Sequence, residues 1–444
     1  MNFFRATILS FAAALLASAP LSASTVIPAK RPAAPVLLRG GTVHTVSGAV
    51  LPDTDVLLID GKIAHIGGKV KAPTNTQVVD ATGKHIYPGF ISPNSQVGLA
   101  ETLSVQATVD TAEVGPVNPN ARTLVAVNPD SELIPVTRIN GVLTTHAAPL
   151  AGGGQGARPA IFAGTSSLIR LDGWTWEDMT IRPAVALYVY WPSMAVATGP
   201  AARPADEQRR EIAARVKVIT DTFAAARAYA GAKTTGAHVP TDLRLEAILP
   251  VLRGETKLFI HADDGKQIAA ALEWAKREKL TFTLVGGRDS WRLAPQLKEA
   301  GVAVVLAGTF NLPPRRDDAF DTPYATAAKL HAAGVAFCIG MGTDGASEPG
   351  NERNLPYEAA LAAAHGLPRD EALKAVTLYP AQILGVASEL GSIEVGKRAT
   401  LIVTDGDPLE IPTKIEHAFI DGAAIELRSR HTDLYEKYRQ RYGK

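Results

Sequence analysis

The chain has 444 residues, of which 46% are hydrophobic and 20% charged, a composition typical of folded globular proteins. Its 45 lysines and arginines nearly balance 44 aspartates and glutamates, and no run of like charge stands out. This balance argues against a nucleic-acid-binding surface and against binding to an anionic membrane. Cys338 is the only cysteine, which excludes an internal disulfide and a cysteine-based zinc site.

The N-terminus has the three-part pattern of a secretory signal peptide. Arg5 supplies a positive charge, residues 7–16 are largely apolar, and small residues follow them. The apolar stretch is shorter than a bilayer requires, so residues 1–24 are interpreted as a cleaved signal and not as an anchor. Residues 25–35 are expected to form a flexible lead-in. The pattern predicts an exported protein, periplasmic or secreted, without a transmembrane segment after signal removal.

Short β-rich runs separated by glycines occur at both ends of the remaining chain, over residues 36–86 and 387–430. One of them predicts a β-hairpin that turns at Asp60 and Gly61. Because both ends have the same character, they are predicted to form one small β-sandwich domain. Residues 431–444 are predicted to be a C-terminal tail.

Residues 87–386 alternate between candidate strands and candidate helices. The strands are short and apolar, as buried parallel strands are. They begin at Gly141, Ala186, Lys257, Thr281, Val302 and Val335. Repeated strand–helix units over this length predict an α/β fold, a (β/α)₈ TIM-type barrel. A doubly wound open sheet is the alternative, but no glycine-rich turn follows an early strand to support it.

Motifs on both sides of this region resemble those of a known family. The entry consists of Gly-Lys-Ile-Ala-His-Ile-Gly at 61–67 and Val-Asp-Ala-Thr-Gly-Lys-His-Ile-Tyr-Pro-Gly-Phe-Ile at 79–91. The exit consists of 371–385, Gly-Ser-Ile-Glu-Val-Gly-Lys at 391–397, and Asp-Gly-Asp-Pro-Leu at 405–409. Over almost all of the mature chain, the sequence resembles the amidohydrolase superfamily, and its imidazolonepropionase-like branch in particular.

The resemblance implies a metal-dependent hydrolase of carbon–nitrogen bonds other than peptide bonds. It places two histidines on the first barrel strand, a lysine on the fourth, a histidine each on the fifth and sixth, and an aspartate on the eighth. The cations lower the pKa of a bound water and polarise the scissile carbonyl. The aspartate takes the proton of the water and passes it to the leaving amine.

The sequence departs from this ligand pattern at most positions. Asn94 and Gln96 stand where the first strand should carry histidines, and amide oxygens are weak ligands for zinc. The fourth strand has no lysine, and the sixth runs into Gly286 where a histidine is expected. His261 at the end of the fifth strand and Asp344 after the eighth are retained.

The resemblance therefore makes His261 and Asp344 candidate metal ligands and Asp344 the candidate catalytic base. His146 and Asp263 are possible pocket residues, although Asp263 and Asp264 also suit a helix N-cap, and His146 a buried structural role. The cofactor is either one divalent metal, zinc by preference, or none.

Two functions remain open. The first is a hydrolase with a reduced or atypical metal site, acting on a small molecule such as a cyclic amide or acyl-amino compound. Hydrolysis without metal, using Asp344 and His261 as acid and base, is a variant of it. The second is a catalytically inactive binding or scaffolding protein in the periplasm that kept the fold.

Overall fold

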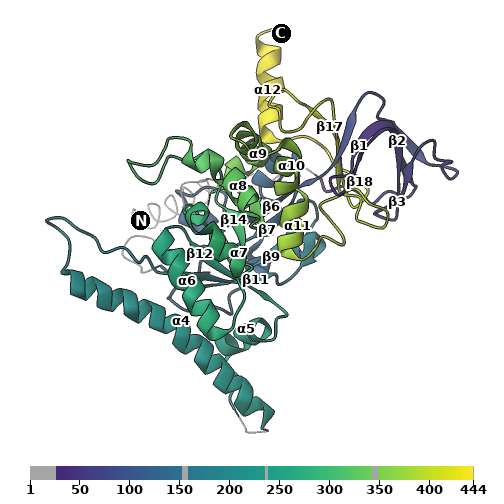
Figure 1. Cartoon of the computed structure of the whole chain (residues 1–444). Coiled ribbons are helices and arrows are strands. Elements are labelled where there is room, and N and C mark those ends of the chain that lie inside the picture. Colours follow the sequence, from purple (N-terminus) through teal and green to yellow (C-terminus); the bar gives the residue numbers. More distant parts are fainter. Residues whose placement is uncertain (1–26, 153–158, 236–238, 343–348, 444) are drawn as a thin grey trace, which may run out of the picture.

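The structure is a computed structural model that describes residues 27–152, 159–235, 239–342 and 349–443. The predicted signal peptide lies outside these ranges. The chain forms an α/β part and, at one side of it, a β-rich part (Figure 1). Strands from the N-terminal and C-terminal regions lie together in that β-rich part (Figure 1).

The β-rich part is one eight-stranded sheet in the order β18-β17-β16-β5-β1-β2-β3, with β4 also paired to β1. Its strands are β1 (Val36–His44), β2 (Val50–Ile59), β3 (Lys62–Gly67), β4 (Gln77–Asp80), β5 (His85–Pro88), β16 (Leu401–Thr404), β17 (Ile415–Ile420) and β18 (Ala423–Ala424). The sheet packs around a single core that draws on both chain ends, including Leu38, Val56, Leu401 and Phe419. The prediction of two stacked layers thus differs from the structure, in which one sheet encloses the core.

The turn between β2 and β3 follows the prediction. Ile59 pairs with Lys62, so the loop has two residues, Asp60 at φ 49° and Gly61 at φ 77°. Two positive φ angles suit a tight hairpin turn, and a glycine adopts one without strain. Side chains are disfavoured at Gly61 for a second reason, because a Cβ there would lie 3.1 Å from the carbonyl oxygen of Asp421.

The α/β part contains two sheets, one in the order β10-β9-β7-β6 and one in the order β15-β14-β13-β12-β11-β8. The strands are β6 (Phe90–Ser95), β7 (Val142–Ala147), β8 (Phe162–Thr165), β9 (Ser167–Arg170), β10 (Thr180–Arg182), β11 (Ala186–Tyr190), β12 (Lys257–Ala262), β13 (Thr283–Gly286), β14 (Ala303–Leu306) and β15 (Phe337–Ile339). Strands β6 and β7 are parallel, as are β11 to β15.

The third strand position departs from a regular (β/α)₈ repeat. Strand β9 pairs antiparallel with β7, and β8 pairs antiparallel with β11. Only Ser166 separates β8 from β9, so one nearly continuous segment connects the two sheets. At the other border, a Cβ on Gly340, just after β15, would lie 3.2 Å from the ring of Pro93 in β6. Strands β15 and β6 are therefore neighbours, although no ladder joins them within the described ranges.

Helices surround the strands of the α/β part (Figure 1). They are α2 (Leu133–Arg138), α3 (Trp176–Met179), α4 (Ala205–Thr234), α5 (Leu243–Leu252), α6 (Gly265–Glu278), α7 (Ala294–Glu299), α8 (Thr322–Ala333), α9 (Leu355–Ala364), α10 (Arg369–Ala375) and α11 (Leu378–Leu384). Short 3₁₀ turns occupy Gln106–Thr108, Thr123–Ala126, Ser290–Leu293 and Pro349–Asn354. The C-terminal helix α12 (Arg430–Arg441) projects from the body (Figure 1). None of the helices in the described part of the chain is long and apolar enough to span a bilayer.

Side chains from successive strands fill the space between them. Ile91, Tyr188, Phe259, Val285 and Cys338 belong to one buried cluster and come from five different strands. These strands all run in the same direction, so their carboxyl ends meet at one face. This face is called the mouth below. The sequence-predicted polar residues of the first and fifth strands lie towards it.

Candidate active site at the mouth

His261 and Asp263 lie at the carboxyl end of β12, the fifth strand position. His261 pairs in register with Tyr190 of β11, and the two rings stack with their centroids 4.8 Å apart. Its Nε2 atom lies 4.0 Å from Oδ2 of Asp263, which is beyond a direct hydrogen bond. Both side chains keep some exposure, 14% for His261 and 19% for Asp263. The pair is thus positioned by the strand and accessible at its rim.

Asp263 occupies space that a side chain on the sixth strand would need. A Cβ built on Gly286 would lie 2.6 Å from Oδ1 of Asp263 and 3.3 Å from Nε2 of His261. Gly286 also has φ 91°, which side chains rarely adopt. A histidine at this position would therefore displace the Asp263 carboxylate. That carboxylate contacts Arg288 at 3.3 Å through Oδ2, whereas its buried Oδ1 has no hydrogen-bond partner in the structure.

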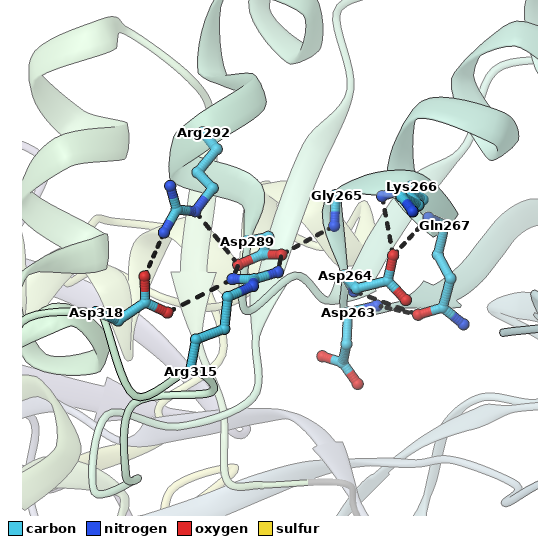
Figure 2. A network of polar contacts seen from close by, with 9 residues as sticks. All are labelled: Asp263, Asp264, Gly265, Lys266, Gln267, Asp289, Arg292, Arg315 and Asp318. Carbon is cyan, nitrogen blue, oxygen red and sulfur yellow. Dashed lines mark hydrogen bonds and ion pairs between the residues drawn. The ribbon is translucent and has the colours of Figure 1, made fainter. Parts of the chain in front are cut away.

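Asp264 begins helix α6 and has a different role from its neighbour. Its carboxylate accepts hydrogen bonds from the backbone N–H groups of Lys266 and Gln267, at 2.8 and 3.0 Å. The Gln267 side chain accepts in return from the backbone N–H of Asp264, which completes a capping box. Figure 2 shows the Asp263 carboxylate directed away from this cap. The prediction of a helix N-cap thus applies to Asp264. Asp263 does not cap the helix, and its carboxylate lies at the mouth.

A second polar group ties together the loops that follow β12, β13 and β14. Asp289 accepts hydrogen bonds from Arg315 and from the backbone N–H of Gly265, the latter at 2.9 Å, and lies 3.6 Å from Arg292 (Figure 2). Asp318 contacts both arginines. We call these residues the Asp289 network. Both carboxylates are 3% exposed.

The charge on Asp289 is stabilised despite its burial. Burial alone would raise the pKa of this carboxyl group, but the hydrogen bonds from Arg315 and the Gly265 N–H outweigh it and hold the pKa below the usual value. The network therefore connects loops at the mouth, with both of its carboxylates paired to arginines.

The first strand presents amide side chains to the interior. Asn94 is 3% exposed, and its Oδ1 accepts a hydrogen bond from the Tyr188 hydroxyl at 2.8 Å. Tyr188 stands on β11, the fourth strand position, and is fully buried. Gln96 follows two residues after Asn94 and is 7% exposed, and its buried Nε2 has no hydrogen-bond partner in the structure. Sequence reasoning identified both amides but not the tyrosine, which has no motif to mark it.

A buried carboxylic acid completes this group. Glu352 is 3% exposed and accepts a short hydrogen bond from the Ser92 hydroxyl of β6. Burial raises the pKa of Glu352 to about 7, while hydrogen bonds from Ser92 and Ser95 oppose the shift. Ser92, Asn94, Gln96, Tyr188 and Glu352 are called the first-strand cluster below. No sequence pattern distinguished Glu352, because its burial depends on contacts with a strand 260 residues earlier.

His146 lies deeper than a pocket residue would. It is fully buried on β7, where its Nδ1 bonds the carbonyl oxygen of Pro93 at 2.8 Å and its Nε2 bonds the Ser166 hydroxyl at 2.7 Å. Burial lowers the pKa of His146 to about 4, so the ring is neutral near pH 7. With both nitrogens engaged, His146 joins β6, β7 and the β8–β9 segment and is not available to a ligand.

The described residues do not fit the cation site that the resemblance implies. Within residues 27–152, 159–235, 239–342 and 349–443, no three histidine, cysteine or acidic side chains are grouped so that they could hold a metal. Asn94 is already bonded to Tyr188, His146 uses both nitrogens, and Gly286 has no side chain. Asp344 lies outside the residues that the structure describes.

The cavities differ in their relation to the mouth. One cavity, of about 980 Å³, is lined by the first residues of strands, such as Lys257, Ala303 and Phe337, and so lies at the opposite end of the strands. Another, of about 380 Å³, is lined by Tyr190 and Trp191 at the end of β11. Catalytic groups in strand–helix barrels stand at the carboxyl ends of strands. The second cavity lies at that end, but His261 and Asp263 do not line it. A small cavity of about 20 Å³ is lined by Gly286, which lies beside that pair.

Parallel strands wrapped by helices, with polar side chains gathered at their carboxyl ends, define the class of α/β barrel enzymes. Comparison with known proteins agrees. Residues 226–424 match the amidohydrolase family. An amidohydrolase from Thermotoga maritima MSB8 has a similar structure, with a TM-score of 0.76 and 25% identity, over 88% of this chain and 100% of that one. Such neighbours imply a TIM-barrel domain with an additional β-rich domain.

Curated sequences point the same way. The imidazolonepropionase of Parabacteroides distasonis is 32% identical over 155 residues, which are 33% of each chain. Amidohydrolase tasK of Hapsidospora irregularis is 24% identical over 368 residues, 77% of this chain and 36% of that protein. The matches span about a third of the length of these relatives. The chain thus matches the amidohydrolase family over residues 226–424 and is similar to imidazolonepropionase and to a solved amidohydrolase.

Proposed function

We propose that this protein hydrolyses carbon–nitrogen bonds, other than peptide bonds, in a small molecule bound at the mouth of a closed barrel. The observation that carries the proposal is the placement of His261 and Asp263, partly exposed at the end of the fifth strand and beside the space left by Gly286. The family match supports the same chemistry, since relatives include imidazolonepropionase and deaminases.

The roles follow from the chemistry of the side chains. Asp344, which the sequence places after the eighth strand, is proposed as the general base that takes a proton from water and returns it to the leaving nitrogen. His261 is proposed to stabilise the charge that develops, either directly or as one ligand of an atypical metal site. No step is assigned to a metal, because the described ligand positions do not fit one.

A second function is supported by one specific contact. The hydrogen bond from Tyr188 to Asn94 engages the residue that would otherwise begin a cation site. A protein whose mouth binds a small molecule without hydrolysing it would carry such a contact at no functional cost. The second candidate is therefore a non-catalytic binding or scaffolding protein in the periplasm.

The deciding experiment assays purified protein against hydantoin, N-acetylated amino acids and substituted ureas, with zinc added and with chelator. Hydrolysis that His261→Ala abolishes and His417→Ala preserves supports the enzyme, since His417 is exposed on β17. Binding of these compounds without any turnover supports the second candidate. Metal analysis of the same samples tells an atypical metal site from hydrolysis without metal.

The proposal includes export across the cytoplasmic membrane. Its support is the charged start, apolar stretch and small residues of positions 1–24. Expression of the full chain should therefore give a periplasmic product whose intact mass lacks the signal. A product that keeps Met1 and remains in the cytoplasm would contradict it.

A further inference from the structure

The side chain of Gln96 has an unmet hydrogen-bonding group in a buried position. Its backbone carbonyl accepts from the N–H groups of Leu99 and Ala100, at 2.9 and 3.1 Å, so that carbonyl is satisfied. Its side-chain Nε2, in contrast, is buried and has no acceptor among the residues that the structure describes. Buried donors are nearly always paired in native proteins, so an unpaired one requires an explanation.

The neighbours of Gln96 indicate where its amide lies. Gln96 directly follows Ser95, the last residue of β6, and Asn94 stands two residues earlier, in a stretch where the pairing with β7 is shifted in register. The side chain of Asn94 meets Tyr188, which belongs to the buried cluster between the strands together with Phe259 and Cys338. Gln96 is thus positioned at the carboxyl end of the strand. This end is the mouth.

The chemistry of the donor limits what can bind it. A primary amide N–H donates to carbonyl, carboxylate or oxyanion oxygens and offers nothing to an ammonium group. Glutamine and asparagine side chains serve as donors to developing oxyanions in enzymes that use no metal at that position. In relatives of this family, the resemblance places a cation-binding histidine at the position of Gln96.

We propose that Gln96 Nε2 binds the carbonyl or carboxylate oxygen of the small molecule held at the mouth, in place of a metal ion. The inference rests on the proposed function and narrows it. The ligand is a neutral or anionic acyl compound, such as an amide, ureide or N-acyl amino acid, and its oxygen supplies the acceptor that Gln96 lacks.

The test replaces the amide by an apolar side chain of similar size. In the free protein, Gln96→Leu removes an unpaired buried donor, so its melting temperature should rise by roughly 1–3 °C. Its affinity for N-acetylglycine and hydantoin, measured by calorimetry, should fall about tenfold, the factor that 1.4 kcal/mol represents. Gln96→Glu, which keeps the shape but loses the donor, should also lose affinity. The exposed Gln77→Leu on β4 is the matched control and should change neither quantity.

Three results would overturn the inference. One is a lower melting temperature for Gln96→Leu, which would show that the amide has a structural partner. Another is affinity within twofold of the unmodified protein, and a third is no binding of either probe by the unmodified protein. Because none of these measurements uses turnover, they are separate from the proposed activity. Binding without hydrolysis would defeat the enzyme proposal alone, and hydrolysis unaffected by Gln96→Leu in both kcat and KM would defeat this inference alone.

Discussion

Two groups of buried polar residues lie near the carboxyl ends of the barrel strands, and they differ in how completely their hydrogen bonds are satisfied. In the Asp289 network, two carboxylates face two arginines and a backbone N–H (Figure 2). In the first-strand cluster, Gln96 keeps an unpaired donor and Glu352 has a pKa raised to about 7. Satisfied groups hold loops in place, whereas unsatisfied buried groups reduce stability and are kept where function needs them.

The largest expected loss of stability comes from disrupting the Asp289 network, whose carboxylates are both paired. Asp289→Asn would leave Arg315 without its charged partner and weaken the contact to the Gly265 N–H. We expect a loss of about 3 kcal/mol in the free energy of unfolding. This is the lower end of the range for removing one partner of a buried ion pair, because Arg315 is 41% exposed. Urea denaturation measures this loss. The control is Lys217→Ala, which breaks an exposed ion pair on α4 and should leave the free energy of unfolding almost unchanged.

The same variant carries a pH dependence. The pKa of Asp289 is lower in the folded protein than in the unfolded chain, so its stabilising effect is present above the unfolded value of about 3.8. It is lost as pH falls through the lower folded value. The difference between the unmodified protein and Asp289→Asn should therefore shrink below about pH 4. A difference that stays constant into acid would mean that the charge is not what holds the network.

Glu352 should behave in the opposite way. Its folded pKa of about 7 lies above the usual 4.5, so it costs stability as pH rises from 4.5 to 7 and adds no further slope above that. Each pKa unit corresponds to about 1.36 kcal/mol, which makes the cost roughly 3 kcal/mol. Glu352→Gln should remove this slope and stabilise the protein at pH 8. Unfolding curves of both proteins at pH 5 and pH 8 test this prediction. If stability changed with pH equally in the variant and the unmodified protein, the raised pKa of Glu352 would be contradicted.

Tyr188→Phe tests the one satisfied amide of the first-strand cluster. Loss of the hydroxyl leaves Asn94 Oδ1 buried without its donor, which should cost about 1–2 kcal/mol. Tyr190→Phe is a matched control, since that hydroxyl bonds the Pro149 carbonyl oxygen and Tyr190 is only partly buried. If the two variants lost the same free energy of unfolding, burial of the contact to Asn94 would contribute nothing to stability.

The smallest effect is expected at the α6 N-cap. Asp264→Ala removes the acceptor for two backbone N–H groups and should cost about 1 kcal/mol. Asp263→Ala should cost less, because Asp263 caps nothing and its Oδ1 is unpaired. Thermal unfolding of the two variants side by side measures the difference. A larger loss for Asp263 would assign it a structural role in place of one at the mouth.

Much of the architecture could be predicted because it depends on local patterns. The Asp60-Gly61 turn follows from two residues that tolerate positive φ. The apolar runs that begin at Ala186, Lys257 and Val302 became β11, β12 and β14, since short apolar segments between helices suit buried parallel strands. The capping residue before α6 was also recognised, although the sequence did not decide between Asp263 and Asp264.

The antiparallel third position could not be predicted. Strand direction depends on which partners a segment meets, and β8 and β9 meet β11 and β7 on opposite sides of Ser166. Tyr188 and Glu352 were missed for a similar reason. Neither belongs to a motif, and each gains its role from a contact with the first strand, about 94 and 260 residues away in the chain.

The sequence by itself determined the resemblance to the amidohydrolase family, the order of most elements, and the residue types at that family's ligand positions, because these are carried by motifs and local periodicity. Only the tertiary structure decided which of those residues are engaged. It placed Tyr188 on Asn94, enclosed His146 between two partners, and set the Asp263 carboxylate in the space beside Gly286. The physical reason is that hydrogen-bond partners and burial arise from segments far apart in sequence, so the chemistry left at the mouth is a property of the packed fold.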